Sequence, residues 1–238
     1  MLRTITWYAY FWGYLVYTAF LLIKPNRLNK ENRIDERNKA AHAAAKNWAR
    51  DIVNFSGAKI KVIGEENIPE KGGVLFVANH QSNMDIPIMI GFVPRDKGLI
   101  SKIELSRVPV FSTWMKYIGC IFINRGHSRE ALATINEGAE SLKSGHALVI
   151  FPEGTRTKDG TVGKFKPGSI KLAMKAKVPI VPVTIKDSMK LMPKGKFIVR
   201  PVTVEVIIAP AIIIDESNEK DSVRISEEIR NTIIENLK

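Results

Sequence analysis

Residues 74–85, "VLFVANHQSNMD", carry the pattern that decides the fold. Five successive apolar residues predict a strand that is buried on both faces, as in a parallel sheet. His80 follows this strand, and Asp85 lies five positions later. On one continuous helix, residues five apart point about 140° away from each other, because a turn contains about 3.6 residues. The two side chains can therefore pair only if the strand ends near His80 and a turn leads into the next helix.

Strand and helix patterns alternate from Ala58 onward, which predicts an α/β fold with a mostly parallel central sheet flanked by helices. Strands are expected at 59–64, 74–79, 98–101, 120–124, 147–151, 180–185 and 202–208. Helices are expected at 84–92, 109–118, 128–143, 168–176 and 217–237. The 238 residues, of which 45% are hydrophobic, suffice for one α/β domain and a small appendage. We place the domain at 58–238, after a two-helix segment at 1–57.

The N-terminal segment has the composition of a membrane-docking helical hairpin. Residues 4–23 contain no charged side chain and are long enough to cross a bilayer core of about 30 Å. Their aromatic rings are spread along the run instead of forming belts at its ends, which favours a helix lying in the interface over one that spans. A helix buried in the protein core is the remaining alternative. After Pro25 we expect a polar connection, and residues 35–55 predict a second helix that folds back on the first.

Charge and cysteine content restrict the partners and the compartment. The formal net charge is +12, and residues 151–201 alone carry +9. On charge alone, nucleic acid and an anionic phospholipid membrane would both qualify as partners. The uncharged N-terminal run favours the membrane, and we expect no nucleic-acid partner. Cys120 is the only cysteine, which excludes an intramolecular disulfide and is compatible with a reducing location on the cytoplasmic side of the cell membrane.

The loop after the 74–79 strand pairs a histidine with a carboxylate. The His80–Asp85 spacing suits a general base and the group that orients it. Two other interpretations remain open. Ser82 and Asp85 have the spacing of a helix capping box, and Ser82 could act as a nucleophile, although no GxSxG elbow surrounds it.

Two further loops follow predicted strands. "GCIFINRG", residues 119–126, places Arg125 directly after a strand. "VIFPEGTRTKDG", residues 149–160, leads a buried strand into Gly154, Thr155 and Arg156. Glycine permits backbone shapes that other residues resist, so backbone N–H groups and the arginine can converge on a phosphate. Each loop is unspecific alone, but the carboxyl ends of parallel strands meet at one edge of the sheet, where chemistry gathers.

The order of the motifs is more specific than any one of them. NHxxxxD, a strand ending in arginine, FPEGTR and then "VPIVPV" at 178–183 together resemble the glycerolipid acyltransferases. Within that family the chain is similar to the 1-acylglycerol-3-phosphate acyltransferases, which make phosphatidic acid. The resemblance covers about residues 58–210, and the preceding hairpin resembles the membrane-docking segment of bacterial members. The third motif of the family often reads FPEGTRS; here Thr157 replaces the serine and keeps a hydroxyl.

The resemblance implies a reaction and roles for several residues. An acyl group would pass from acyl-ACP or acyl-CoA to the sn-2 hydroxyl of 1-acylglycerol 3-phosphate. His80 would be the general base, and Asp85 would fix its tautomer and stabilise the imidazolium. The acceptor would be bound by Arg125 and by Glu153, Gly154, Thr155 and Arg156. Lys102, which follows the expected strand at 98–101, is a further candidate for the phosphate. We expect Glu153 to hold arginine side chains or a glycerol hydroxyl, since a carboxylate is out of place beside a phosphate.

No cofactor or metal is expected for this chemistry. The four histidines show no ligand spacing such as HExxH, and the single cysteine offers no cluster. The expected partners are an anionic membrane, a lysophosphatidate acceptor and, for an acyl-ACP donor, the acyl carrier protein. The alternatives are acylation of glycerol 3-phosphate or another lysophospholipid, a thioesterase or esterase, and a non-catalytic basic membrane-binding protein.

Overall fold

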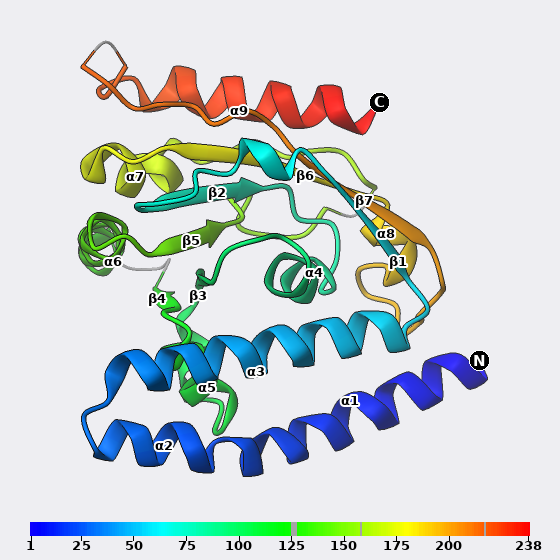
Figure 1. The fold of residues 1–238 in the computed structure, drawn as a ribbon. Helices are drawn as coiled ribbons and strands as arrows, with labels where there is room; N and C mark the ends of the chain where they lie inside the picture. The colour runs from blue at the N-terminus through cyan, green and yellow to red at the C-terminus, as the bar shows by residue number, and fades with distance from the viewer. Residues whose placement is uncertain (125–127, 158, 217) are drawn as a thin grey trace.

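The computed structural model describes residues 1–124, 128–157, 159–216 and 218–238 and has the expected α/β architecture (Figure 1). Its helices are α1 (Leu2–Leu21), α2 (Ile23–Lys30), α3 (Ile34–Phe55), α4 (Asp85–Gly91), α5 (Phe111–Tyr117), α6 (Ser128–Lys143), α7 (Lys171–Ala176), α8 (Ser188–Leu191) and α9 (Ser222–Leu237). Its strands are β1 (Lys59–Ile63), β2 (Val74–Ala78), β3 (Lys97–Lys102), β4 (Ile121–Ile123), β5 (Ala147–Ile150), β6 (Ile180–Lys186) and β7 (Thr203–Ile208).

The strands of the described residues form one sheet in the order β1-β7-β6-β2-β5-β3-β4. Neighbouring strands run parallel except β6 and β7, which are antiparallel. The mostly parallel sheet predicted from the sequence is therefore confirmed. β5 lies between β2 and β3, with Val77 beside Ile150 and Leu99 beside Val149. The carboxyl ends of these three strands thus lie side by side at one edge.

The position of β2 in the sheet explains why its sequence is an unbroken apolar run. Phe76 and Ala78 face a core that includes residues of α1, α3, α4 and α5. Leu75 and Val77 face the opposite core, which is built with α6, α7 and α9. All five residues of β2 are buried, as expected for a central strand with helices over both faces. Figure 1 shows the two helical layers on either side of the sheet.

The N-terminal helices fold back on each other as the sequence predicted. The indole Nε1 of Trp7 donates to the carbonyl of Ile52 at 3.0 Å, and the hydroxyl of Tyr14 donates to Asp51 Oδ2 at 2.9 Å. These bonds hold α1 against α3.

The connection after the first helix differs from the expectation. Residues 23–30 form α2 instead of an irregular polar segment. Pro25 lies in the first turn of α2, where the missing N–H has no partner within the helix and the fixed φ angle suits the helix. Leu28 and Pro25 are buried, so packing stabilises a stretch whose polar composition gave no helical signal.

Candidate active site

The His80–Asp85 pair lies in the turn between β2 and α4. His80 Nδ1 and Asp85 Oδ2 are 2.7 Å apart, and the same oxygen accepts the backbone N–H groups of Gln81 at 2.7 Å and Ser82 at 2.8 Å. The Asp85 side chain is fully buried, whereas that of His80 is 15% exposed. From the sequence, Asp85 could either cap the turn or pair with His80. In the structure its Oδ2 atom does both.

The His80 ring is held on a second side by Phe151, which directly follows β5. The two rings stack with centroids 4.2 Å apart and planes 21° from parallel. An Nδ1–H donated to Asp85 leaves the lone pair of the other ring nitrogen, Nε2, for a substrate proton. The pair therefore has the geometry of an oriented general base. Sequence reasoning did not single out Phe151, although it opens the FPEGTR motif.

The FPEGTR loop encloses the backbone of His80. The N–H of His80 donates to Glu153 Oε1 at 2.8 Å, and its carbonyl accepts the N–H of Thr157 at 2.9 Å. Glu153 Oε2 accepts the N–H of Gly163 at 2.9 Å. Burial raises the pKa of Glu153, while the two backbone N–H groups act in the opposite direction. This placement differs from the contact with arginine side chains or a glycerol hydroxyl that the sequence suggested.

The rest of this loop faces a lysine that the sequence gave no reason to select. Gly154 adopts φ +72°, which confirms the need for glycine at this position. Thr155 is exposed, and its Oγ1 accepts a hydrogen bond from Lys194 Nζ at 3.2 Å. Lys194 also donates to the carbonyl of Arg156. Lys194 thereby bridges the FPEGTR loop to the segment after α8.

The remaining predicted phosphate ligands come from the neighbouring strands. Lys102 is the last residue of β3, is exposed, and pairs in register with Ile123 of β4. It therefore lies at the same sheet edge as the loop after β5. Arg125 follows β4 but lies outside the described residues.

Neither Ser82, the alternative nucleophile, nor the Cys120 thiol is set up for attack. The buried hydroxyl of Ser82 donates to the carbonyl of Met192 at 2.9 Å and accepts the N–H of Met84 at 3.2 Å. Cys120 is buried and accepts the N–H of Leu99, and burial raises the pKa of its thiol to about 12. Both groups are therefore structural. Within the described ranges, no three His, Cys, Asp or Glu side chains gather in a way that could hold a metal ion.

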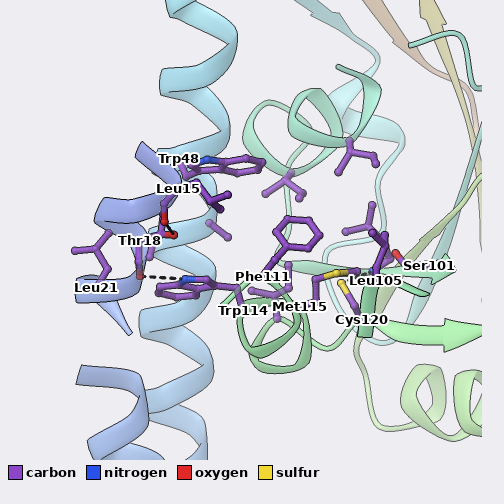
Figure 2. Close-up of a pocket in the computed structure, with 16 residues that line it drawn as sticks. Leu15, Thr18, Leu21, Trp48, Ser101, Leu105, Phe111, Trp114, Met115 and Cys120 are labelled. Atoms are coloured by element: carbon purple, nitrogen blue, oxygen red, sulfur yellow. Dashed lines mark hydrogen bonds between the residues drawn. The ribbon is translucent and has the colours of Figure 1, made fainter. Parts of the chain in front are cut away.

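An apolar cavity of about 80 Å³ lies between the N-terminal helices and the α/β domain (Figure 2). Ile86 and Ile90 of α4 line it, and Ile86 directly follows Asp85. The indole Nε1 of Trp114 donates to the carbonyl of Thr18 at 3.2 Å, which ties α5 to α1 at this place. The cavity therefore lies next to the helix that begins at Asp85.

One face of α1 is exposed although it is apolar. Its most exposed large side chains are Leu2, Ile5, Trp12, Val16 and Phe20, each between 60% and 76% exposed. Their spacing of three, four and seven residues places them on one stripe of the helix. In the part of the chain that the structure describes, no helix combines the length and the apolar composition needed to cross a membrane.

Comparison with known proteins assigns the family. The family model described as Acyltransferase matches residues 59–186, a stretch that holds the His80–Asp85 turn and the FPEGTR loop. The chain belongs to the acyltransferase family. It is 32% identical over 183 residues to the 1-acyl-sn-glycerol-3-phosphate acyltransferase of Borreliella burgdorferi, covering 77% of this chain and 73% of that protein. It is 35% identical over 187 residues to the Saccharomyces cerevisiae enzyme of the same name, covering 76% and 61%.

The match to a third relative covers a shorter part of the chain, whereas the match to a solved structure covers nearly all of it. A probable 1-acyl-sn-glycerol-3-phosphate acyltransferase of Mycoplasma pneumoniae is 38% identical over 146 residues, or 60% of this chain and 54% of that protein. The matches thus span between half and two thirds of the Mycoplasma and yeast relatives. The crystal structure of the 1-acyl-sn-glycerophosphate acyltransferase PlsC from Thermotoga maritima superposes with a TM-score of 0.84 at 27% identity, covering 99% of this chain and 94% of that one.

Proposed function

We propose that this acyltransferase moves an acyl group from an acyl thioester to the sn-2 hydroxyl of 1-acylglycerol 3-phosphate, giving phosphatidic acid. The observation that carries the proposal is the 2.7 Å contact between the His80 ring and the buried Asp85 carboxylate at the carboxyl end of β2. The activity for which the yeast and Borreliella burgdorferi relatives are named supports this acceptor.

The reaction follows from the orientation of His80. Its Nε2 takes the proton of the sn-2 hydroxyl while the hydroxyl oxygen attacks the thioester carbonyl carbon. Collapse of the tetrahedral intermediate breaks the C–S bond, and the imidazolium returns the proton to the leaving thiolate. Asp85 fixes the tautomer and stabilises the imidazolium between these steps. A positioned base contributes about 10²–10⁴-fold to the rate.

The acceptor phosphate is assigned to three cations that the sequence places at or after the ends of β3, β4 and β5. Lys102 is the last residue of β3, Arg156 lies in the loop after β5, and Arg125 comes after β4 in the sequence. A guanidinium presents paired donors that suit a phosphate dianion. Glu153 contributes to this site indirectly, because its two carboxylate oxygens accept the backbone N–H groups of His80 and Gly163.

The apolar surfaces are assigned to lipid. We place part of the acyl chain of the donor, acyl-ACP or acyl-CoA, in the cavity beside α4, because an alkyl chain needs an apolar lining and α4 begins at Asp85. We place the exposed stripe of α1 in the interface of an anionic phospholipid membrane, on its cytoplasmic side, where the lipid acceptor resides.

Acyl transfer from a labelled thioester to 1-acylglycerol 3-phosphate in detergent micelles tests the proposal. His80→Ala should lower the rate by about 10²–10⁴-fold, since the base is lost. His146→Ala is the matched control, because His146 is exposed at the amino end of β5, and it should keep the wild-type rate. Circular dichroism checks that both variants are folded.

Three outcomes would contradict the proposal. Equal rates for wild type and His80→Ala would exclude His80 as the general base. Acyl release without an acceptor would indicate a thioesterase. No turnover by the wild type with either donor, and with glycerol 3-phosphate as a second acceptor, would favour a membrane-binding protein without catalysis.

A further inference from the structure

The segment between α8 and β7 presents an exposed aromatic side chain on a defined turn. In residues 192–200, here the 192–200 loop, the N–H of Lys196 donates to the carbonyl of Pro193 at 3.1 Å, and Gly195 adopts φ +77°. A turn with this positive angle at its third residue favours glycine. Phe197 follows the turn and is 82% exposed, more than any other described large apolar side chain except Met1. Such exposure costs free energy in water unless another apolar phase covers the ring.

The 192–200 loop lies against the N-terminal half of α1. The Phe197 ring is 6.2 Å from that of Tyr8, and the N–H of Val199 donates to Thr4 Oγ1 at 3.2 Å. In a helix, Thr4 and Tyr8 lie one turn apart at the edge of the stripe formed by Leu2, Ile5, Trp12, Val16 and Phe20. Figure 1 shows this amber segment reaching from α8 toward the same end of the molecule. Phe197 therefore extends the exposed apolar stripe of α1 sideways.

The positive charge around Phe197 indicates that an anionic bilayer is the environment that fits this surface. Residues 188–201 contain four basic side chains and no acidic one. Lys190 is paired with Asp187 at 2.8 Å and Lys194 is bonded to the FPEGTR loop, whereas Lys196 and Arg200 are exposed on either side of Phe197 in the sequence. An aromatic tip between cations matches the interface of an anionic bilayer, where the ring enters the headgroup region and the cations meet lipid phosphates.

We propose that the 192–200 loop is a second bilayer contact, in which Phe197 inserts into the interface of an anionic membrane beside α1. The inference rests on the proposed membrane association of α1. A helix that lies in the interface can roll about its axis, whereas a second contact off that axis fixes the orientation of the protein.

The loop is also bonded to both halves of the active site. The hydroxyl of Ser82 donates to the carbonyl of Met192 at 2.9 Å, next to the His80–Asp85 turn. Lys194 donates to Thr155 Oγ1 and to the carbonyl of Arg156. Membrane contact by Phe197 therefore holds the FPEGTR loop at the lipid surface from which the acceptor comes.

Depth-dependent fluorescence quenching tests the insertion. A bimane label is attached to the Phe197→Cys variant; Cys120 is buried, so the introduced thiol reacts selectively. The protein is mixed with phosphatidylcholine–phosphatidylglycerol vesicles that contain nitroxide lipids. Phe20→Cys reports the stripe of α1. Val223→Cys is the negative control, because Val223 is 61% exposed on α9, across the sheet from α1. We expect quenching at positions 197 and 20 and none at position 223.

Partition of unlabelled variants into the same vesicles gives the size of the effect. Phe197→Ala should weaken partition by about tenfold, because an interfacial phenyl ring is lost. Val223→Ala should change it by less than about twofold.

Each deviating pattern has one meaning. Quenching at position 20 without quenching at 197 overturns the second contact and leaves association through α1 intact. Quenching at neither overturns membrane association itself, and quenching at all three shows unspecific adsorption and overturns the proposal as well. The labels report without turnover, so failure of acyl transfer in the micelle assay is a separate result.

Discussion

The variant Glu153→Gln tests whether the Glu153 carboxylate positions His80 or binds a glycerol hydroxyl of the acceptor. Glu153 accepts the N–H of His80 at 2.8 Å with one oxygen and that of Gly163 at 2.9 Å with the other. Glutamine has the same shape but only one oxygen. In either orientation of the amide, its NH₂ group faces one of the two N–H donors. The variant therefore loses one of the two bonds that hold the active-site loops together.

The magnitude follows from opposing contributions. A hydrogen bond to a charged group is worth about 1.5–3 kcal/mol, and an unsatisfied buried donor costs about 1–3 kcal/mol. A neutral amide avoids the burial cost that raises the pKa of Glu153, so the net loss falls at the lower end. We expect a destabilisation of about 1–2 kcal/mol and, because the base shifts, a fall in kcat of about 5- to 30-fold.

Steady-state kinetics with each substrate varied in turn separates the two roles. If Glu153 positions His80, kcat falls while KM for 1-acylglycerol 3-phosphate changes by less than about twofold. If Glu153 binds a glycerol hydroxyl, KM for the acceptor rises and kcat is nearly unchanged, which would refute the positioning argument. Glu140→Gln is the matched control, since Glu140 is 68% exposed on α6 and should leave both constants unchanged.

Two further predictions concern a buried lysine and the apolar cavity. Burial lowers the pKa of Lys97 to about 7, although its Nζ donates to the carbonyls of Met89 and Val93. This pKa lies below the value of about 10.4 in the unfolded chain, so the unfolded chain binds more protons than the folded protein between these two pH values. The stability of the wild type relative to Lys97→Met should therefore rise with pH, by up to about 1.4 kcal/mol per pH unit. Denaturant unfolding at pH 7 and pH 9 measures this, and a pH-independent difference would contradict it. Ala45→Leu fills part of the cavity and should lower kcat/KM for a long acyl donor relative to a short one by about tenfold, whereas Ala43→Leu, at an exposed position of the same helix, should not. An unchanged ratio in a competition assay between the two donors would place the chain elsewhere.

The sequence predicted the parts of the site that depend on local order. A buried strand, a turn with the spacing of His80 and Asp85, and a helix opening at Asp85 lie within one short stretch, so periodicity and capping rules suffice to describe them. The glycine angle at Gly154 was predictable for the same reason. The alternation of such units then gives the mostly parallel sheet.

Features that depend on distant contacts were not predictable in this way. Glu153 and His80 are 73 positions apart, so their bond becomes visible only when β2 and β5 are known to be adjacent. Lys194 reaches the FPEGTR loop from a segment without periodicity. The helix at 23–30 is stabilised by packing against the rest of the N-terminal segment, which overrides its weak local preference. The antiparallel direction of β7 likewise follows from how the chain returns to the sheet.

Helix α4 connects the His80–Asp85 pair, the proposed base and its partner, to the apolar cavity. Its first residue, Asp85, orients His80, and Ile86 and Ile90 of the same helix line the apolar cavity. Near its other end, Lys97 Nζ donates to the carbonyl of Met89. A chain that fills the cavity therefore packs against the element whose position sets the His80–Asp85 contact. Because a base acts only within hydrogen-bond reach of the proton it removes, contacts far along the acyl chain should be expressed in kcat as well as in KM.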